Sequence, residues 1–374
     1  MQYRTFGKTG LQVSALGFGA MRFTDGLDGK VDQKLVDQLV GTAVERGVNY
    51  FDTSQNYLNG QSEPVLGSAL KGLRDKVYIA TKVGSWHDQG GGLADLDKHL
   101  EGQLRDLQTD YIDCYLLHTL NDNHWPKFQK LDVCSWLQRK QREGKIRFLG
   151  YSFHGAESYF SAILNDFDWD FTMIQYNYVD VKFQAGEAGL LASHAKGCGT
   201  AIMEPMRGGT LTDKLPPAMM ALLKEANPVL SPAAWAFRFL YDREEVNIAI
   251  SGMNCMAHLE ENLALADVSA IGCLSDSERA TLHKAGQMFH QLLRAPCTNC
   301  GYCTPVCPQG IDIPTYLLRY NEHALFDVKW HKNAYLESVK KSKPCIYCGK
   351  CNAECPQGID IPKMLGEVEK HFKG

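Results

Sequence analysis

Short apolar runs alternate with longer amphipathic stretches over the first 250 or so residues of the chain. The runs are rich in β-branched and aromatic residues, and each is followed by a stretch with helical periodicity. Strands that alternate with helices in this way are typical of parallel sheets. The pattern predicts eight strands, at residues 15–21, 49–53, 77–82, 111–118, 147–152, 171–177, 199–204 and 247–252.

Most of these runs are apolar almost throughout, instead of alternating between apolar and polar residues. A strand with this pattern is covered on both faces, as in a parallel sheet surrounded by helices. Eight such strand–helix units in about 250 residues favour an α/β fold of the (β/α)8 or TIM-barrel type. A doubly wound open sheet is the alternative.

The length of the chain predicts a second domain, and its composition excludes some classes of protein. The chain has 374 residues, which is comfortable for a barrel and an appendage. The chain has 44% hydrophobic and 22% charged residues and a formal net charge of −4. It has no apolar run that could span a bilayer and no secretory signal. We therefore expect a cytoplasmic protein without a membrane or nucleic-acid partner. Five cysteines are scattered through apolar stretches, and we expect them to pack as small hydrophobic residues: Cys114, Cys134, Cys198, Cys255 and Cys273.

Polar residues stand at or just after the ends of consecutive predicted strands. They are Asp52, Tyr57 five residues further on, Lys82 and His118. Singly, each has an ordinary structural explanation, but chemistry in a barrel gathers at the carboxyl ends of the strands. A tyrosine hydroxyl is too weak an acid to protonate a carbonyl oxygen near neutral pH unless a nearby ammonium stabilises its phenolate. A carboxylate would fix the ammonium, and a histidine would hydrogen-bond the carbonyl. The four residues therefore predict acid catalysis of carbonyl reduction.

At these positions the sequence resembles the aldo/keto reductase family over roughly residues 1–270. The resemblance implies a hydride transfer between a nicotinamide cofactor and an aldehyde or ketone, with Tyr57 as general acid and Asp52, Lys82 and His118 around it. The matching segments are RTFGKTGLQVSALGFG, FDTSQNYLNGQSEPVLGSAL, ATK, LQTDYIDCYLLH, GKIRFLGYS, QYNY and SGMNCMAHLEENL.

The family's cofactor contacts match less completely. Ser152 and Gln175 stand where the resemblance implies contacts to the nicotinamide carboxamide. The family usually has a stacking aromatic after the seventh strand, whereas this chain offers Met203 or Met206. Arg207 could supply a cation to the cofactor or be a solvated loop residue.

The closing segment of the resemblance, after Gly252, implies contacts to the adenosine half of the cofactor. Asn254 takes the place of the family's usual arginine, with His258 further on, and Glu261 and Asn262 match the adenine-binding pair. Because phosphate recognition depends on guanidinium or ammonium groups, the choice between NAD and NADP stays open at this point.

Two cysteine repeats follow the barrel. Residues 297–317 and 345–365 share 13 of 21 positions at an offset of 48, including every cysteine. The spacing C-x2-C-x2-C-x3-C-P matches the run of bacterial two-cluster ferredoxins, in which the fourth cysteine ligates the other [4Fe–4S] cluster. Two structural zinc sites are the alternative. The match implies one cluster on Cys297, Cys300, Cys303 and Cys355, and another on Cys345, Cys348, Cys351 and Cys307.

The segment between the two parts reads as a helix. Ser275 and Glu278 form a capping-box pattern before Leu282, Met288, Phe289 and Leu292, and the helical pattern stops near Pro296. We therefore expect a barrel at residues 1–272, a connecting helix at 273–295 and a small helical ferredoxin-like domain at 296–374.

A reductase-like barrel together with two iron–sulfur repeats leaves three functions open, because nicotinamide exchanges two electrons as hydride whereas a cluster passes one electron at a time. The first is a nicotinamide-dependent carbonyl reductase (or alcohol dehydrogenase) whose clusters dock a partner, cover the site or sense oxidation. The second is an electron-transfer enzyme whose clusters feed a flavin or the substrate directly. The third is a redox-sensing regulatory subunit with an inactive barrel. Lys340, Lys341 and Lys343, just before Cys345, are either a solvated face or a group that meets an acidic redox partner.

The substrate stays open, since the expected pocket loops GSWHDQGGG, HTLNDNHWPKF and YVDVKFQAGEAG would suit a sugar, a quinone or a small ketone.

Overall fold

A computed structural model describes residues 1–23, 30–212, 214–268, 270–298, 300–326, 329–340 and 343–373. The chain forms two compact units. The first contains Met1–Pro205 and Ala236–Ser275, and the second contains Met206–Trp235 and Asp276–Gly374.

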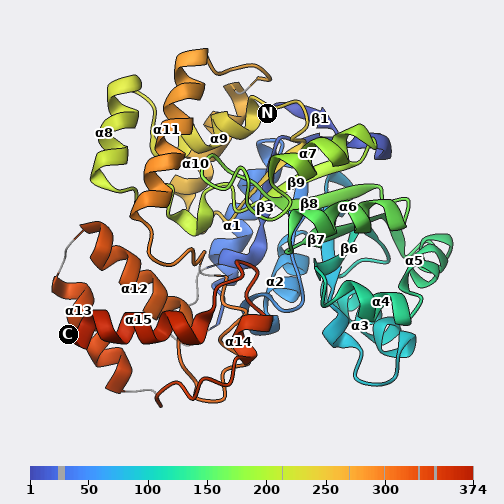
Figure 1. The fold of residues 1–374 in the computed structure, drawn as a ribbon. Coiled ribbons are helices and arrows are strands. Elements are labelled where there is room, and N and C mark those ends of the chain that lie inside the picture. The colour runs from blue at the N-terminus through green and yellow to red at the C-terminus, as the bar shows by residue number, and fades with distance from the viewer. Residues whose placement is uncertain are drawn as a thin grey trace. The chain divides into compact units, whose positions relative to one another are not determined.

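The first unit is built on a closed barrel of eight parallel strands, which Figure 1 shows ringed by helices. Neighbouring strands follow one another along the chain, and the last pairs with the first. All eight predicted strands are present, so the barrel is confirmed and the open sheet is wrong. The strands are β3 (Leu16–Gly19), β4 (Tyr50–Asp52), β5 (Tyr78–Val83), β6 (Ile112–Leu120), β7 (Ile146–Phe153), β8 (Phe171–Gln175), β9 (Gly199–Met203) and β10 (Ile248–Ser251).

Helices cover the outer face of this barrel. The helix α1 (Gln33–Glu45) is an example of how the sequence determines where a helix begins. The side chain of Asp32 accepts a hydrogen bond from Leu35 N at 3.1 Å and caps this helix, which buries its apolar face. The helices of this layer are α1 (Gln33–Glu45), α2 (Ser62–Ala69), α3 (Leu93–Asp106), α4 (Trp125–Lys130), α5 (Val133–Arg142), α6 (Glu157–Asp166), α7 (Gly186–Ala195), α9 (Pro232–Tyr241) and α10 (Met256–Val268).

A hairpin of β1 (Tyr3–Thr5) and β2 (Gln12–Ser14) precedes the barrel. Phe6, between its strands, is fully buried and packs its ring on Phe171 at 5.3 Å and on Tyr50 at 5.9 Å. The approach is so close that a Cβ on Gly199 would lie 2.4 Å from the Phe6 ring. The hairpin thus adds apolar residues to the core inside the strands. The apolar-run pattern did not predict it, because its strands, YRT and QVS, contain mostly polar residues.

The second unit is helical in the part that the structure describes. Its helices are α8 (Pro217–Ala226), α11 (Asp276–Leu292), α12 (Ile313–Phe326), α13 (Lys329–Lys340), α14 (Lys350–Ala353) and α15 (Ile361–Lys373). The pair α8 and α11 lie side by side, and α12, α13 and α15 pack together around the rings of Tyr316, Tyr335 and Phe372. Within the described residues, no helix is both long and apolar enough to cross a membrane.

Helix α11 corresponds to the predicted connecting helix and begins directly after Ser275. It buries Leu282 and Phe289, whereas Leu292 is exposed. Arg207 is not a solvated loop residue: it is 2% exposed, its Nη2 donates to Pro296 O at 3.1 Å, and its guanidinium lies 5.1 Å from the Phe289 ring centroid. The alternative of a solvated arginine is therefore wrong.

Candidate active site and cysteine clusters

Asp52 and Lys82 form a buried ion pair at the carboxyl ends of neighbouring strands. Strand β4 ends at Asp52 and β5 carries Lys82 one residue before its end. Lys82 Nζ donates to both carboxylate oxygens, at 2.8 and 2.7 Å, and to Thr53 O at 2.7 Å. The ammonium thus has three acceptors, which holds it in one place.

Tyr57 and His118 lie beside this pair. Tyr57 begins the short 3-10 helix η3 (Tyr57–Gly60) after β4, and His118 lies in β6. Lys82 Nζ is 4.8 Å from the centroid of the Tyr57 ring, and the rings of Tyr57 and His118 meet edge to face with centroids 6.1 Å apart. The structure therefore brings all four residues of the predicted catalytic set together at one end of the barrel.

Burial controls the protonation of this set. Removal from water raises the pKa of Asp52 and lowers the pKa of Lys82, while their mutual attraction opposes both shifts. Burial, with the Lys82 charge next in size, also lowers the pKa of His118 well below its ordinary value. His118 is thus a neutral imidazole at physiological pH and can donate or accept a hydrogen bond without carrying charge.

Trp86 connects His118 to two further imidazoles. Its ring centroid lies 5.4 Å from that of His118, 5.6 Å from that of His87 and 5.4 Å from that of His124. Burial lowers the pKa of His87 to about 3 and that of His124 to about 4. The residue comes from the expected pocket loop GSWHDQGGG, but the sequence did not single it out, because His118 and His124 belong to the next strand–helix unit and lie more than 30 residues away in the chain.

A second buried carboxyl group lies on the outer side of β5. Glu63, 1% exposed, accepts hydrogen bonds from Thr81 Oγ1 and from Gln103 Nε2, the latter at 2.7 Å. Gln103 also donates to Lys82 O at 3.0 Å and accepts from Tyr115 Oη at 2.8 Å. Burial raises the pKa of Glu63 to about 7. Sequence reasoning missed this network, although the segment QSEPVLGSAL gave a polar residue on an apolar helix face as a signal.

The residues expected at the nicotinamide lie at the ends of β7, β8 and β9. Ser152 Oγ accepts a hydrogen bond from Thr119 N at 2.8 Å, which leaves the Ser152 hydroxyl proton for a donor role. Gln175 Nε2 donates to Asp180 Oδ2 at 2.8 Å. Met203 ends β9 and is half-buried.

The residues expected at the adenosine half follow β10. Gly252 comes directly after the strand, and the backbone is close enough to Arg22 that a Cβ on Gly252 would lie 2.6 Å from Arg22 Cγ. Asn254 Oδ1 and His258 Nδ1 are 3.0 Å apart. Helix α10 carries His258, and also Glu261 and Asn262, whose Nδ2 donates to Ser251 Oγ at 3.0 Å.

In the second unit, the eight late cysteines fall into two groups of four. Burial raises the pKa of Cys303, and the neighbouring thiols Cys300, Cys297 and Cys355 add to that rise. Burial likewise raises the pKa of Cys351 to about 11, with contributions from Cys345, Cys307 and Cys348. Each group thus takes three cysteines from one repeat and the last cysteine of the other, which is the grouping that the ferredoxin spacing predicts; ligation itself stays a prediction.

The backbone around these thiols supplies donors to sulfur. The amides of Ile359, Gln357 and Gly358 bond Cys355 and lower its pKa, although burial, the larger effect, raises it overall. Tyr347 N lies 3.4 Å from Cys345 Sγ. Such N–H···S contacts favour thiolate over thiol and are typical of cluster ligation.

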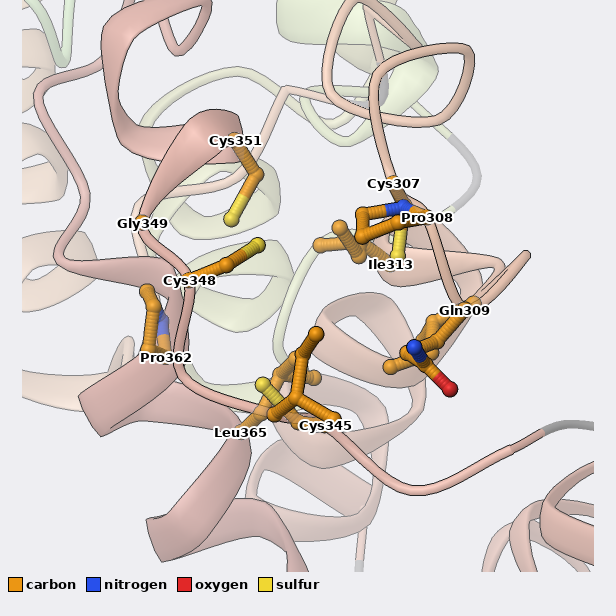
Figure 2. Close-up of a pocket in the computed structure, with 12 residues that line it drawn as sticks. Cys307, Pro308, Gln309, Ile313, Cys345, Cys348, Gly349, Cys351, Pro362 and Leu365 are labelled. Atoms are coloured by element: carbon orange, nitrogen blue, oxygen red, sulfur yellow. The ribbon is translucent and has the colours of Figure 1, made fainter.

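A pocket of about 320 Å³, including its opening to solvent, lies among the second group. Figure 2 shows the sulfurs of Cys307, Cys345, Cys348 and Cys351 turned toward this space, with Leu365 and other apolar residues around them. Among the described residues, no three His, Cys, Asp or Glu side chains are arranged around a single metal ion. Four thiols around one space are the donor set that a [4Fe–4S] cluster takes, so the residues present suit such a cluster.

Comparison with known proteins matches both parts of the chain. The model of the aldo/keto reductase family matches residues 15–285, and that of a 4Fe-4S dicluster domain matches residues 296–360. L-galactose dehydrogenase from Arabidopsis thaliana is 26% identical over 298 residues, which cover 73% of this chain and 90% of the plant protein.

Solved structures agree with this match. An aldo-keto reductase from Bacillus halodurans in its holo form is 26% identical, with a TM-score of 0.64 over 76% of this chain and 96% of its own. An aldo/keto reductase from Klebsiella pneumoniae in complex with NADP and acetate is 25% identical, with a TM-score of 0.61 over 76% of this chain and 94% of its own. The chain therefore belongs to the aldo/keto reductase family of oxidoreductases, and it carries a C-terminal 4Fe-4S dicluster domain.

Proposed function

We propose that the protein reduces an aldehyde or ketone, or oxidises the corresponding alcohol, with a nicotinamide cofactor and with Tyr57 as general acid and base, and that it carries two [4Fe–4S] clusters. The observation that carries the barrel part of the proposal is the position of Lys82. Its ammonium is fixed by Asp52 and lies 4.8 Å from the Tyr57 ring.

The proton chemistry follows from this arrangement. In the reduction, Tyr57 Oη donates a proton to the carbonyl oxygen, and the nearby Lys82 ammonium stabilises the phenolate that remains. His118, neutral because it is buried, orients the carbonyl by a hydrogen bond. In the alcohol oxidation, the same groups act in reverse, with the phenolate as base.

Nicotinamide supplies the hydride when bound. The residues present suit it: the Ser152 hydroxyl has its proton available for a carboxamide oxygen, and the neighbouring Thr119 Oγ1 is a buried polar atom without a hydrogen-bond partner among the described residues. The NADP complex of the Klebsiella pneumoniae relative supports nicotinamide over flavin as the first cofactor to test. Asn254, which replaces a cation, makes NAD as strong a candidate as NADP.

The thiols would hold two clusters, one on Cys297, Cys300, Cys303 and Cys355 and the other on Cys345, Cys348, Cys351 and Cys307. The support is the grouping of the sulfurs and the amides that face Cys355. Clusters of this kind supply one-electron transfer. The proposed carbonyl reduction needs two electrons at once, and the nicotinamide provides both, so the clusters are not required for it.

Anaerobically purified protein, loaded to about eight irons per chain, tests the proposal. NADH and NADPH oxidation is followed with a panel of aldehydes, ketones and sugars, and nucleotide reduction with the corresponding alcohols. We expect turnover with at least one pair of substrate and nucleotide. If neither nucleotide is consumed or bound and an acid extract contains flavin, the nicotinamide proposal fails. If iron stays near four per chain, the two-cluster proposal fails.

A further inference from the structure

The second cysteine repeat places two large apolar side chains on the surface. Ile346 is 56% exposed and Tyr347 is 64% exposed, directly after Cys345. The offset of 48 between the repeats makes Thr298 the counterpart of Ile346, and Thr298 is 2% exposed. At these equivalent positions the polar residue is buried and the apolar residue is exposed. This is the reverse of the usual distribution, in which apolar side chains are buried.

The thiol group next to these side chains reaches the surface. Cys348 is the exposed one of the eight late cysteines, and its counterpart in the first repeat, Cys300, is half-buried. Electron transfer weakens steeply with distance, so the edge of the second group at Cys348 is the favourable place for an electron to enter or leave.

Two exposed lysines flank this edge along the chain. Lys343 and Lys350 are exposed before and after Ile346 and Tyr347. The sequence from Ser338 to Ala353 contains four lysines and no acidic residue. Lys341 and the side chain of Lys340 lie outside the described part of the chain. Along the chain, the nearest acidic residues on either side of the segment are Glu337, exposed, and Glu354, half-buried, and Asp360 further on is exposed.

We propose that Lys343, Ile346, Tyr347, Cys348 and Lys350 form a docking surface for an acidic protein that carries one electron, of the ferredoxin or flavodoxin kind. The inference rests on the proposed two-cluster assignment. Apolar contacts by Ile346 and Tyr347 would hold the complex, and the lysines would steer an acidic carrier toward it. Electron-transfer complexes have small interfaces, so a surface of this size suffices for a transient encounter.

The step balances as a single electron transfer. The reduced carrier loses one electron, and a cluster held by Cys345, Cys348, Cys351 and Cys307 would gain it. No bond forms or breaks. The reductant is the carrier itself, and the same surface serves the reverse direction when the carrier arrives oxidised.

The test uses anaerobic holoprotein and a reduced plant-type ferredoxin as the acidic carrier, with cluster bleaching followed by stopped-flow absorbance. We expect the second-order rate constant to fall as salt rises, and to fall at least about tenfold in the variants I346S/Y347S and K343E/K350E. The matched control is V229S/K224E, which changes one exposed apolar residue and one exposed lysine of the same unit, and it should react as the wild type does.

Dithionite, a small reductant that needs no docking, should bleach every variant to the same extent. Failure to bleach the wild type with dithionite would indicate that the cluster assignment is wrong, independently of docking. Wild-type rates with ferredoxin in both variant pairs would overturn the docking proposal. So would sedimentation showing a wild-type dimer that I346S/Y347S dissociates, because the face would then join two copies of this chain.

Discussion

Lys82 donates to both oxygens of the Asp52 carboxylate while its ammonium stands 4.8 Å from the Tyr57 ring. The pair is buried, with Lys82 1% and Asp52 4% exposed, so each charge depends on the other for compensation. One ion pair therefore serves two purposes, since it keeps a positive charge inside the barrel and places that charge where a phenolate would form.

Tyr57→Phe removes the proposed proton donor and little else. We expect the rate of carbonyl reduction to fall by about 10²–10⁴-fold, because positioned general acids contribute that much. The measurement is nucleotide oxidation under saturating substrate, together with the cluster absorbance, which should not change. Tyr151→Phe is a matched control, since Tyr151 is a buried tyrosine of the same barrel outside the proposed set. Activity close to the wild-type value in Tyr57→Phe would contradict the assignment.

Asp52→Asn should destabilise the barrel, because it leaves the Lys82 ammonium buried without its counter-charge. We expect a loss of about 3–5 kcal/mol in the free energy of unfolding. The double variant D52L/K82M removes both charges and should recover most of that loss, although both proteins should be inactive. Urea unfolding of the two variants beside the wild type decides the matter. Equal stability of the single and double variants would mean that the ammonium is not the source of the penalty.

Glu63 should make stability depend on pH. Its pKa is raised to about 7 in the folded protein, against an ordinary value of 4.5, so the folded state binds more protons than the unfolded state between these values. Its contribution to stability is therefore full below about pH 4.5, falls as pH rises toward 7 and is lost above. Integrated over this range, the loss is about 3 kcal/mol.

Glu63→Gln removes this dependence while it keeps the hydrogen-bonding shape. The unfolding free energy of the wild type minus that of Glu63→Gln should decline between pH 5.5 and 7 by about 2 kcal/mol and level off above. Comparison with the variant cancels the contributions of the clusters and of other carboxylates. A difference that stays constant over this range would show that Glu63 is already ionised in the folded protein.

The sequence predicted the features that depend on local pattern. Runs that are apolar on both faces identified all eight barrel strands, and the spacing of the cysteines predicted the grouping that Cys303 and Cys351 show. Polar residues at strand ends found Asp52 and Lys82, because a barrel gathers the carboxyl ends of its strands at one rim.

Features that depend on long-range packing were not predictable in this way. Glu63 acquires its environment from Gln103, 40 residues away, and Trp86 lies against His118 and His124, which both come from the next strand–helix unit. The sequence left Arg207 open between a cofactor contact and a solvated loop, because nothing nearby in the sequence shows that Phe289 of α11 covers its guanidinium. Single-residue burial of this kind is set by elements that meet only in the folded chain.

Asn254→Arg tests the choice of nucleotide. An arginine at this position would offer a charged donor to a 2′-phosphate, and hydrogen bonds to charged groups contribute about 1.5–3 kcal/mol. We expect the KM for NADPH to fall at least about tenfold, while that for NADH changes little. Asn254→Gln, which lengthens the side chain without charge, is the control. If both nucleotides respond equally, Asn254 does not face the adenosine phosphate.

Double cysteine variants test whether the ligands cross between the repeats. If Cys355 completes the cluster of the first repeat, C297A and C355A damage the same cluster, and the double variant C297A/C355A should lose no more iron than either single one. Each should keep about four irons of about eight. C355A/C345A, by contrast, combines residues of one repeat that serve different clusters, and it should lose nearly all iron.

Iron analysis and cluster absorbance after anaerobic purification provide the measurement, with C134A, a cysteine of the barrel, as the control that keeps full iron. Pairing within each repeat would give the reverse result, with C355A/C345A keeping about half the iron and C297A/C355A losing nearly all of it. The structure favours crossing, because the thiols that surround Cys303 include Cys355 from the other repeat, and those that surround Cys351 include Cys307. The two repeats would then depend on each other for metal, so neither could fold around a complete cluster alone.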